Sequence, residues 1–105
     1  MGTEHSYALR LTLRAEADME DIWLYGAAEW SPERADRYVD GITAVLDLLC
    51  AMPGIARERL EFTPPVRIHT YGAHLIIYRT AGDYLDVLRI LGGHQDWHRL
   101  LEMLE

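Results

Sequence analysis

Hydrophobic and polar residues alternate along the first part of the chain. From Tyr7 to Leu13 a large apolar residue occupies every second position, with Arg10 and Thr12 among the residues between them. A period of two is typical of a strand with one buried face, so we predict a first strand here. Thr12 can then act as the N-cap of a helix that begins near Leu13, because its side-chain oxygen can accept from a free backbone N–H of the first turn.

The spacing of apolar residues then changes to that of helices. One set recurs on a single helical face: Ala15, Met19, Ile22, Trp23, Gly26, Ala27 and Trp30. A second set follows: Ala35, Tyr38, Val39, Ile42, Val45, Leu46 and Leu49. Between them, Ser31 followed by Pro32 is typical of a new helix start, and Pro53-Gly54 is expected to end the second helix. Because the link is short, we predict an antiparallel helical hairpin.

The remainder of the chain has the pattern of short strands and turns that is typical of a small sheet. Residues 56–65 are mainly polar and end in two prolines, so we predict an exposed loop. Three strands are predicted after it, with glycine-containing turns between them: Val66–Tyr71, Ala73–Arg79 and Tyr84–Leu91. In Asp96–Leu104 the apolar residues Trp97, Leu100, Leu101 and Leu104 follow the i, i+3, i+4, i+7 spacing of a short amphipathic helix.

This order of elements predicts an α+β fold of the type β-α-α-β-β-β. The helical hairpin would pack on a small, mostly antiparallel sheet, followed by the short C-terminal helix. A chain of 105 residues has room for a single core, so we predict one domain that spans residues 1–105.

The net charge of −7 changes the list of plausible partners. Residues 1–54 hold ten acids and four arginines, whereas residues 55–105 hold seven acids and six arginines. Proteins that grip nucleic acid need a basic face, because contacts to phosphates dominate that affinity. We therefore expect no direct binding of nucleic acid, and any anionic surface would meet the C-terminal half.

Other features of the composition indicate a protein of a reducing compartment. Cys50 is the one cysteine, which excludes an internal disulfide, and its apolar surroundings favour a buried, inert thiol. No apolar run approaches the length of a membrane span, and residues 1–7 lack the apolar core of a signal peptide. We expect a cytoplasmic protein with no membrane association.

Three stretches, taken in order, resemble the RelE/ParE superfamily of toxins. The first is "LTLRAEADMEDIWLYGAAEWSPERADRYVDGI", with its acidic helix start and paired aromatics; the second is the Pro-Gly loop in "MPGIARERLE". The third is the sheet region "VRIHTYGAHLIIYRTAGDYLDVLRILGGHQDW", which runs to Arg89-Ile90-Leu91 and Asp96-Trp97. The resemblance covers about Tyr7 to Trp97. It implies a small bacterial toxin that a cognate antitoxin holds inactive.

The superfamily has two branches, and the residues favour one of them. RelE-like members are ribosome-dependent messenger RNA endonucleases, whereas ParE-like members poison DNA gyrase. Metal-free RNA cleavage needs a general base, a general acid and cations for the phosphorane. The family often has a histidine where this chain has Gly92, and the lysines of the nuclease branch are absent. We therefore predict a ParE-like toxin with a ParD-like antitoxin and DNA gyrase as partners.

The endonuclease remains the alternative. It would use Arg67 and Arg89 together with His94 or Tyr78, and His74 is a further candidate for proton transfer. For the ParE-like interpretation we expect no catalytic residue, no metal and no cofactor.

Candidate binding residues follow from the resemblance and from residue type. Candidates for contact with the target lie on the predicted strands and just after them: Arg67, Arg79, Arg89, His94 and Trp97. Candidates for contact with the antitoxin are large apolar residues of the helices: Trp23, Trp30, Leu100, Leu101 and Leu104. Large aromatic side chains often contribute much of the binding energy of an interface.

Each candidate also has a structural interpretation. The three arginines can be surface residues paired with nearby acids: Asp83, Asp86 or Glu61. Trp23 and Trp30 can be core residues, and the acids of residues 16–21 can form a solvated helix face. The C-terminal apolar stripe can dock on the protein's own sheet.

The histidines have structural interpretations too. His69 and His74 flank a turn and are expected on the hairpin surface. His94 and His98 have the i, i+4 spacing of metal ligands but no third ligand beside them.

Overall fold

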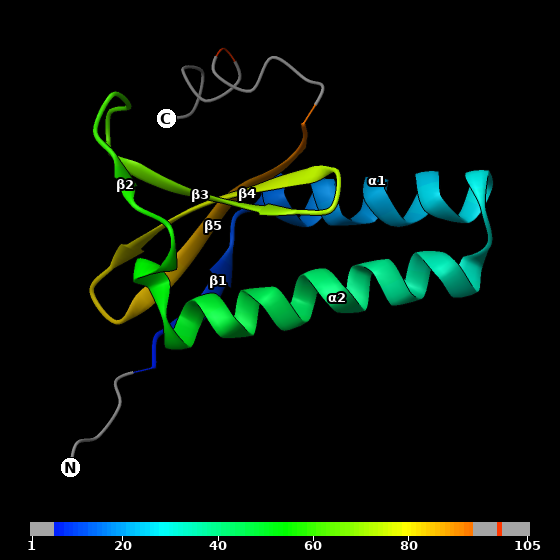
Figure 1. The fold of residues 1–105 in the computed structure, drawn as a ribbon, viewed down its shortest axis with the longest axis horizontal. Coiled ribbons are helices and arrows are strands. Elements are labelled where there is room, and N and C mark those ends of the chain that lie inside the picture. Colours follow the sequence, from blue (N-terminus) through cyan, green and yellow to red (C-terminus); the bar gives the residue numbers. More distant parts are fainter. Residues whose placement is uncertain (1–5, 94–98, 100–105) are drawn as a thin grey trace.

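A computed structural model describes residues 6–93 and residue 99. Its elements in chain order are β1 (Ala8–Leu11), α1 (Leu13–Glu29), α2 (Pro32–Ala51), a 3₁₀ helix η1 (Pro53–Ile55), β2 (Glu58–Arg59), β3 (Val66–Tyr71), β4 (His74–Ala81) and β5 (Tyr84–Gly92). The strands form one sheet in the order β1-β5-β4-β3-β2, and both helices lie against one face of it (Figure 1). The predicted α+β fold is confirmed. The predicted C-terminal helix falls outside the described residues.

Both helices begin where their capping residues were predicted. The Thr12 side chain accepts a hydrogen bond from the Ala15 N–H at 3.0 Å, and Ser31 does the same for the Arg34 N–H at 3.1 Å. Pro32 occupies the first turn of α2, where the absence of a backbone N–H costs nothing. The hairpin follows from these two caps and the short link between them. None of the helices described is both long and apolar enough to cross a membrane.

The sheet is antiparallel except at one edge. β1 pairs with β5 in parallel, with Leu9 opposite Leu85, while β2, β3, β4 and β5 pair in antiparallel order. A bulge interrupts the β4–β5 ladder, because Ile77 lies opposite Arg89 whereas Tyr78 lies opposite Val87. Strand β5 therefore carries one extra residue at this point.

Two apolar clusters lie on opposite faces of the sheet. The larger cluster joins the helices to the sheet and includes Ile42, Leu46, Ile76, Tyr78 and Ile90. The smaller cluster consists of Phe62, Val66, Ile77 and Leu91. Successive side chains of a strand point to opposite faces, and Ile76 and Ile77 accordingly belong to different clusters.

The structure corrects several sequence-based expectations. The segment 56–65 is not a wholly exposed loop, because it contains β2 and the buried Phe62. Trp30 is not a core residue, since 56% of it is exposed. The strand boundaries were close: Val66–Tyr71 is confirmed, and the later two strands extend to Ala81 and Gly92. Cys50 is buried and free, as predicted, and burial raises the pKa of its thiol.

Candidate functional site

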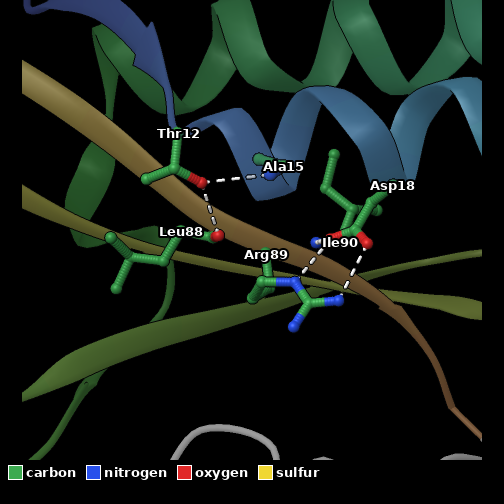
Figure 2. Close-up of polar contacts among 6 residues, drawn as sticks. All are labelled: Thr12, Ala15, Asp18, Leu88, Arg89 and Ile90. Atoms are coloured by element: carbon green, nitrogen blue, oxygen red, sulfur yellow. Dashed lines mark hydrogen bonds and ion pairs between the residues drawn. The ribbon is translucent and has the colours of Figure 1, made fainter. Parts of the chain in front are cut away.

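The helix α1 closes the edge of β5 where the parallel partner strand stops. β1 ends at Leu11, opposite Val87, so within residues 6–93 the backbone of β5 beyond that point has no neighbouring strand on this side. The Thr12 hydroxyl donates to the carbonyl of Leu88 at 2.8 Å, and the Asp18 carboxylate accepts from the N–H of Ile90 at 2.9 Å (Figure 2). Side chains thus replace a strand along this edge.

Asp18 also holds Arg89 in a bidentate ion pair. The two contacts are 2.8 Å from Nε and 2.9 Å from the second guanidinium nitrogen, and the side chains are only 12% and 14% exposed (Figure 2). The hydrogen bonds to Asp18 raise the pKa of Arg89 above its ordinary value, and burial opposes that shift. Arg89 therefore pairs with an acid of α1, not with Asp83 or Asp86, and Asp18 is not part of a solvated face.

A groove of about 640 Å³ opens beside this ion pair. The connected ends of α1 and α2 extend past the turn between β3 and β4 (Figure 1). The groove lies between this overhang and the adjacent end of the sheet. Its helical side includes Ile22, Tyr25 and Trp30, and its sheet side includes His74 and Ile90.

Tyr38 connects α2 to the sheet at the groove. Its hydroxyl lies 2.7 Å from Nδ1 of His74 and accepts from the N–H of Ala73 at 3.2 Å. Gly72, in the turn between β3 and β4, has a φ of +56°, and a Cβ there would lie 2.7 Å from the Tyr38 hydroxyl. Burial raises the pKa of Tyr38. His74 is therefore a half-buried, hydrogen-bonded residue and not the hairpin-surface residue that was predicted.

Two of the residues that line the groove are exposed aromatic residues. Tyr25 is 64% exposed and packs edge-to-face on Trp30, with ring centroids 6.4 Å apart. The guanidinium of Arg34 lies over the Trp30 ring at 4.7 Å. Trp30 therefore lines the groove, whereas Trp23 is not among its lining residues. The Trp23 indole N–H instead donates to Asp36 at 2.7 Å and ties α1 to α2.

The groove carries one acid whose charge has no partner among the described residues. Asp18 and Asp21 both line it, one helical turn apart. Asp18 is paired with Arg89, but Asp21 has no hydrogen bond or ion pair among the described residues. An occupant of the groove would thus meet apolar walls, two exposed rings and one free carboxylate.

The residues proposed for RNA cleavage that the structure describes are committed to other contacts. Tyr78 is fully buried, its hydroxyl donates to the carbonyl of Pro53 at 2.7 Å, and burial raises its pKa. Arg67, opposite Tyr78 on β3, donates to the carbonyl of Ala56 at 2.6 Å. Both side chains fix the segment after α2. Arg89 is on β5, two strands away from β3 in the sheet, and is held there by Asp18.

The remaining candidates are spread over the chain. Arg79 lies on β4 and has no hydrogen bond or ion pair in the part of the chain that the structure describes. Asp86 pairs with Arg10 and Glu61 with Arg59, so neither acid takes the arginine partner proposed for it. Five candidates lie outside the described residues: His94, Trp97, Leu100, Leu101 and Leu104.

Sequence reasoning missed the acids and the tyrosines of the groove. A signal for Asp18 was available, because it lies three residues after Ala15 and four before Ile22, both on the apolar face. An acid on the apolar face of a helix usually has a buried partner. No comparable signal exists for Tyr25, whose position depends on the overhang of the hairpin.

Comparisons with known proteins agree with one another. Residues 9–97 match the family model described as ParE toxin of type II toxin-antitoxin system, parDE. Toxin ParE1 of Mycobacterium tuberculosis is 32% identical over 92 residues, which cover 87% of this chain and 94% of that protein. Toxin ParE1 of Caulobacter vibrioides is 30% identical over 82 residues, covering 78% and 84%.

A solved structure shares the fold as well. It is titled as the chromosomal ParDE TA system from P. aeruginosa, and it superposes with a TM-score of 0.73 at 26% sequence identity. The match covers 84% of this chain and 97% of that one.

Proposed function

The chain belongs to the ParE toxin family of type II toxin–antitoxin systems, and we propose that it acts by binding and poisoning DNA gyrase. Membership of a ParDE system implies a ParD-like antitoxin as its partner. The gyrase proposal places the protein in the bacterial cytoplasm, where gyrase works. The alternative is ribosome-dependent cleavage of messenger RNA.

One observation supports binding over cleavage. Metal-free RNA cleavage needs an acid, a base and a cation within reach of one phosphate. Among the described residues, Tyr78 is enclosed, and Arg67 and Arg89 are bound to Ala56 and Asp18. Gly92 occupies the position where a histidine was expected. The cleavage candidates among the described residues thus do not converge on a shared open site.

The test measures both activities with the same purified toxin. We expect it to inhibit supercoiling of relaxed plasmid by purified gyrase, and to leave a message translated by purified ribosomes intact. Circular dichroism and antitoxin binding establish that the toxin is folded. Unimpaired supercoiling together with cleavage of the message, lost in Arg67→Ala, would establish the endonuclease alternative.

The groove beneath the hairpin is our proposed site for the antitoxin. Its apolar walls and the exposed rings of Tyr25 and Trp30 suit the apolar face of a helix, which commonly binds in such grooves. The free carboxylate of Asp21 suits a lysine or arginine on that helix. We therefore propose that an amphipathic antitoxin segment with a basic residue fills the groove.

The neighbouring reading frame provides an independent check of the pairing. A short gene next to this one, with a ribbon-helix-helix start and a tail that includes a basic amphipathic segment, is the expected antitoxin. Co-expression with that gene should abolish the growth arrest caused by the toxin alone. Continued arrest in the presence of a stably expressed neighbour would contradict the pairing.

A further inference from the structure

The two layers of the fold differ in charge. Helices α1 and α2 together carry nine acids and three arginines, whereas the strands carry five arginines and two acids. The net charge of −7 is therefore concentrated on the helices, and the sheet is locally basic. A partner that contacts the strands meets a different electrostatic surface from one that contacts the helices.

Three charged residues form a row across the sheet. Arg79 of β4 lies opposite Asp86 of β5, and Asp86 lies opposite Arg10 of β1. Leu85 and Val87, on either side of Asp86, belong to the cluster under the helices, so the row points to the other face. Neighbouring strands are about 4.8 Å apart, which places the two arginine Cα atoms about 10 Å from each other.

Arg10 and Asp86 are already satisfied and well positioned. Asp86 accepts from two nitrogens of Arg10, at 2.7 Å and 3.1 Å, and the Arg10 guanidinium stacks on the Tyr84 ring at 3.8 Å. The Arg10 side chain is nevertheless 51% exposed, while Asp86 is 13% exposed. The ion pair fixes the direction of Arg10 and leaves much of its guanidinium accessible.

Arg79 is the member of the row whose charge is not paired among the described residues. Its cross-strand neighbour Asp86 is bound to Arg10, and Arg79 has no ion pair among the described residues. The row therefore carries two cations and one anion. Two guanidinium groups on a rigid sheet, one of them stacked on an aromatic ring, match the planar geometry of carboxylates.

We propose that the row Arg79–Asp86–Arg10 binds an acidic segment of the toxin's target protein. This inference rests on the proposed function, in which that target is DNA gyrase. A protein segment suits the surface better than nucleic acid does, because one exposed and one half-buried arginine in a chain of net charge −7 provide too little basic surface to follow a phosphate backbone. The row lies on the face of the sheet away from the helices, so it is separate from the groove that we assign to the antitoxin.

Charge reversal at Arg79 tests the proposal. We expect Arg79→Glu to raise the toxin concentration for half-inhibition of gyrase supercoiling by at least about tenfold, because it replaces attraction by repulsion. Arg79→Lys should retain most of the inhibition. Surface plasmon resonance with immobilised gyrase should show the same order, and the difference between wild type and Arg79→Glu should shrink in high salt.

A matched control separates this surface from a general effect of charge. Arg37→Glu makes the same change on the exposed surface of α2 and should leave gyrase inhibition unchanged. Both variants should bind the purified antitoxin as tightly as wild type, which also shows that they are folded.

The outcomes distinguish the two proposals. If the wild-type toxin does not inhibit gyrase, the proposed function fails, and this inference fails with it. If the wild type inhibits and Arg79→Glu inhibits equally, only the inference is wrong. Loss of antitoxin binding in Arg79→Glu with unchanged gyrase inhibition would assign the row to the antitoxin. Loss of binding to plasmid DNA with unchanged binding to gyrase would assign it to nucleic acid.

Discussion

Strand β5 takes part in two bidentate arginine–aspartate pairs that share a geometry but differ in surroundings. In the pair of Arg89 with Asp18, both side chains are at most 14% exposed, and the carboxylate also accepts a backbone N–H. In the pair of Arg10 with Asp86, the arginine is 51% exposed and stacks on Tyr84. The first pair joins a helix to the sheet, whereas the second joins two neighbouring strands.

The difference in burial gives the two pairs different roles. A charge left alone in a buried site is costly, so a buried pair becomes essential to the fold once it exists. In the second pair Asp86 is 13% exposed but Arg10 is 51% exposed, so Arg10 is solvated with or without Asp86 and the pair contributes little to stability. We therefore interpret the Asp18–Arg89 pair as a structural connection and the Arg10–Asp86 pair as a device that orients an accessible guanidinium.

The largest expected effect comes from breaking the buried pair. Asp18→Ala leaves Arg89 without its carboxylate and the Ile90 N–H without an acceptor, and we expect it to lower the free energy of unfolding by about 3 kcal/mol. Denaturant unfolding of the purified toxin measures this loss. Asp18→Asn keeps an acceptor for Ile90 and should lose less. A change in Asp18→Ala below about 1 kcal/mol would contradict the structural role.

An intermediate effect is expected one helical turn further along α1, where the acid is not paired. Asp21→Arg should weaken binding of the antitoxin about tenfold, or about 1.4 kcal/mol, with little change in the stability of the free toxin. Titration calorimetry with the purified antitoxin provides the measurement. Glu20→Arg is the matched control, because the exposed Glu20 does not line the groove. Equal affinities for both variants would argue against the proposed role of Asp21.

The smallest expected effect comes from breaking the exposed pair. Asp86→Ala should leave the midpoint of denaturant unfolding almost unchanged, because Arg10 can remain solvated and stacked on Tyr84. Measured beside Asp18→Ala in the same buffer, it tests the comparison directly. A loss of stability as large as that of Asp18→Ala would show that exposure does not separate the two pairs.

Much of the fold could be predicted because its signals are local. The starts of both helices depend on Thr12 and Ser31, whose caps act within three residues. The strands follow from alternation along short stretches. The two-residue strand β2 was missed because its neighbouring polar residues give no alternating pattern, and its pairing with β3 is a tertiary contact.

Residues of the candidate site could be selected from the sequence by their type, but the residue that each of them contacts could not be predicted. Arg89 was identified as a candidate, but its acid lies 71 positions away in a run that resembles a solvated face. Trp30 was expected in the core because of its helical spacing. It is exposed because α1 ends at Glu29 and the hairpin extends beyond the sheet that would otherwise cover it (Figure 1).

The extra residue in β5 determines which side chains of that strand face the helices. Leu88 packs with the cluster on the outer face, and Arg89 lies opposite Ile77 of that cluster, so two consecutive residues share one side. Without this bulge, a β5 of the same residues would alternate strictly after Val87, so Arg89 would point under the helices and Ile90 away from them. Deletion of Leu88 would remove the bulge and leave Arg89 and Ile90 on their present faces, because Val87 and Ile90 would then be two positions apart. The bulge thus lets Leu88 and Arg89 share the outer face while Ile90 still packs under the helices.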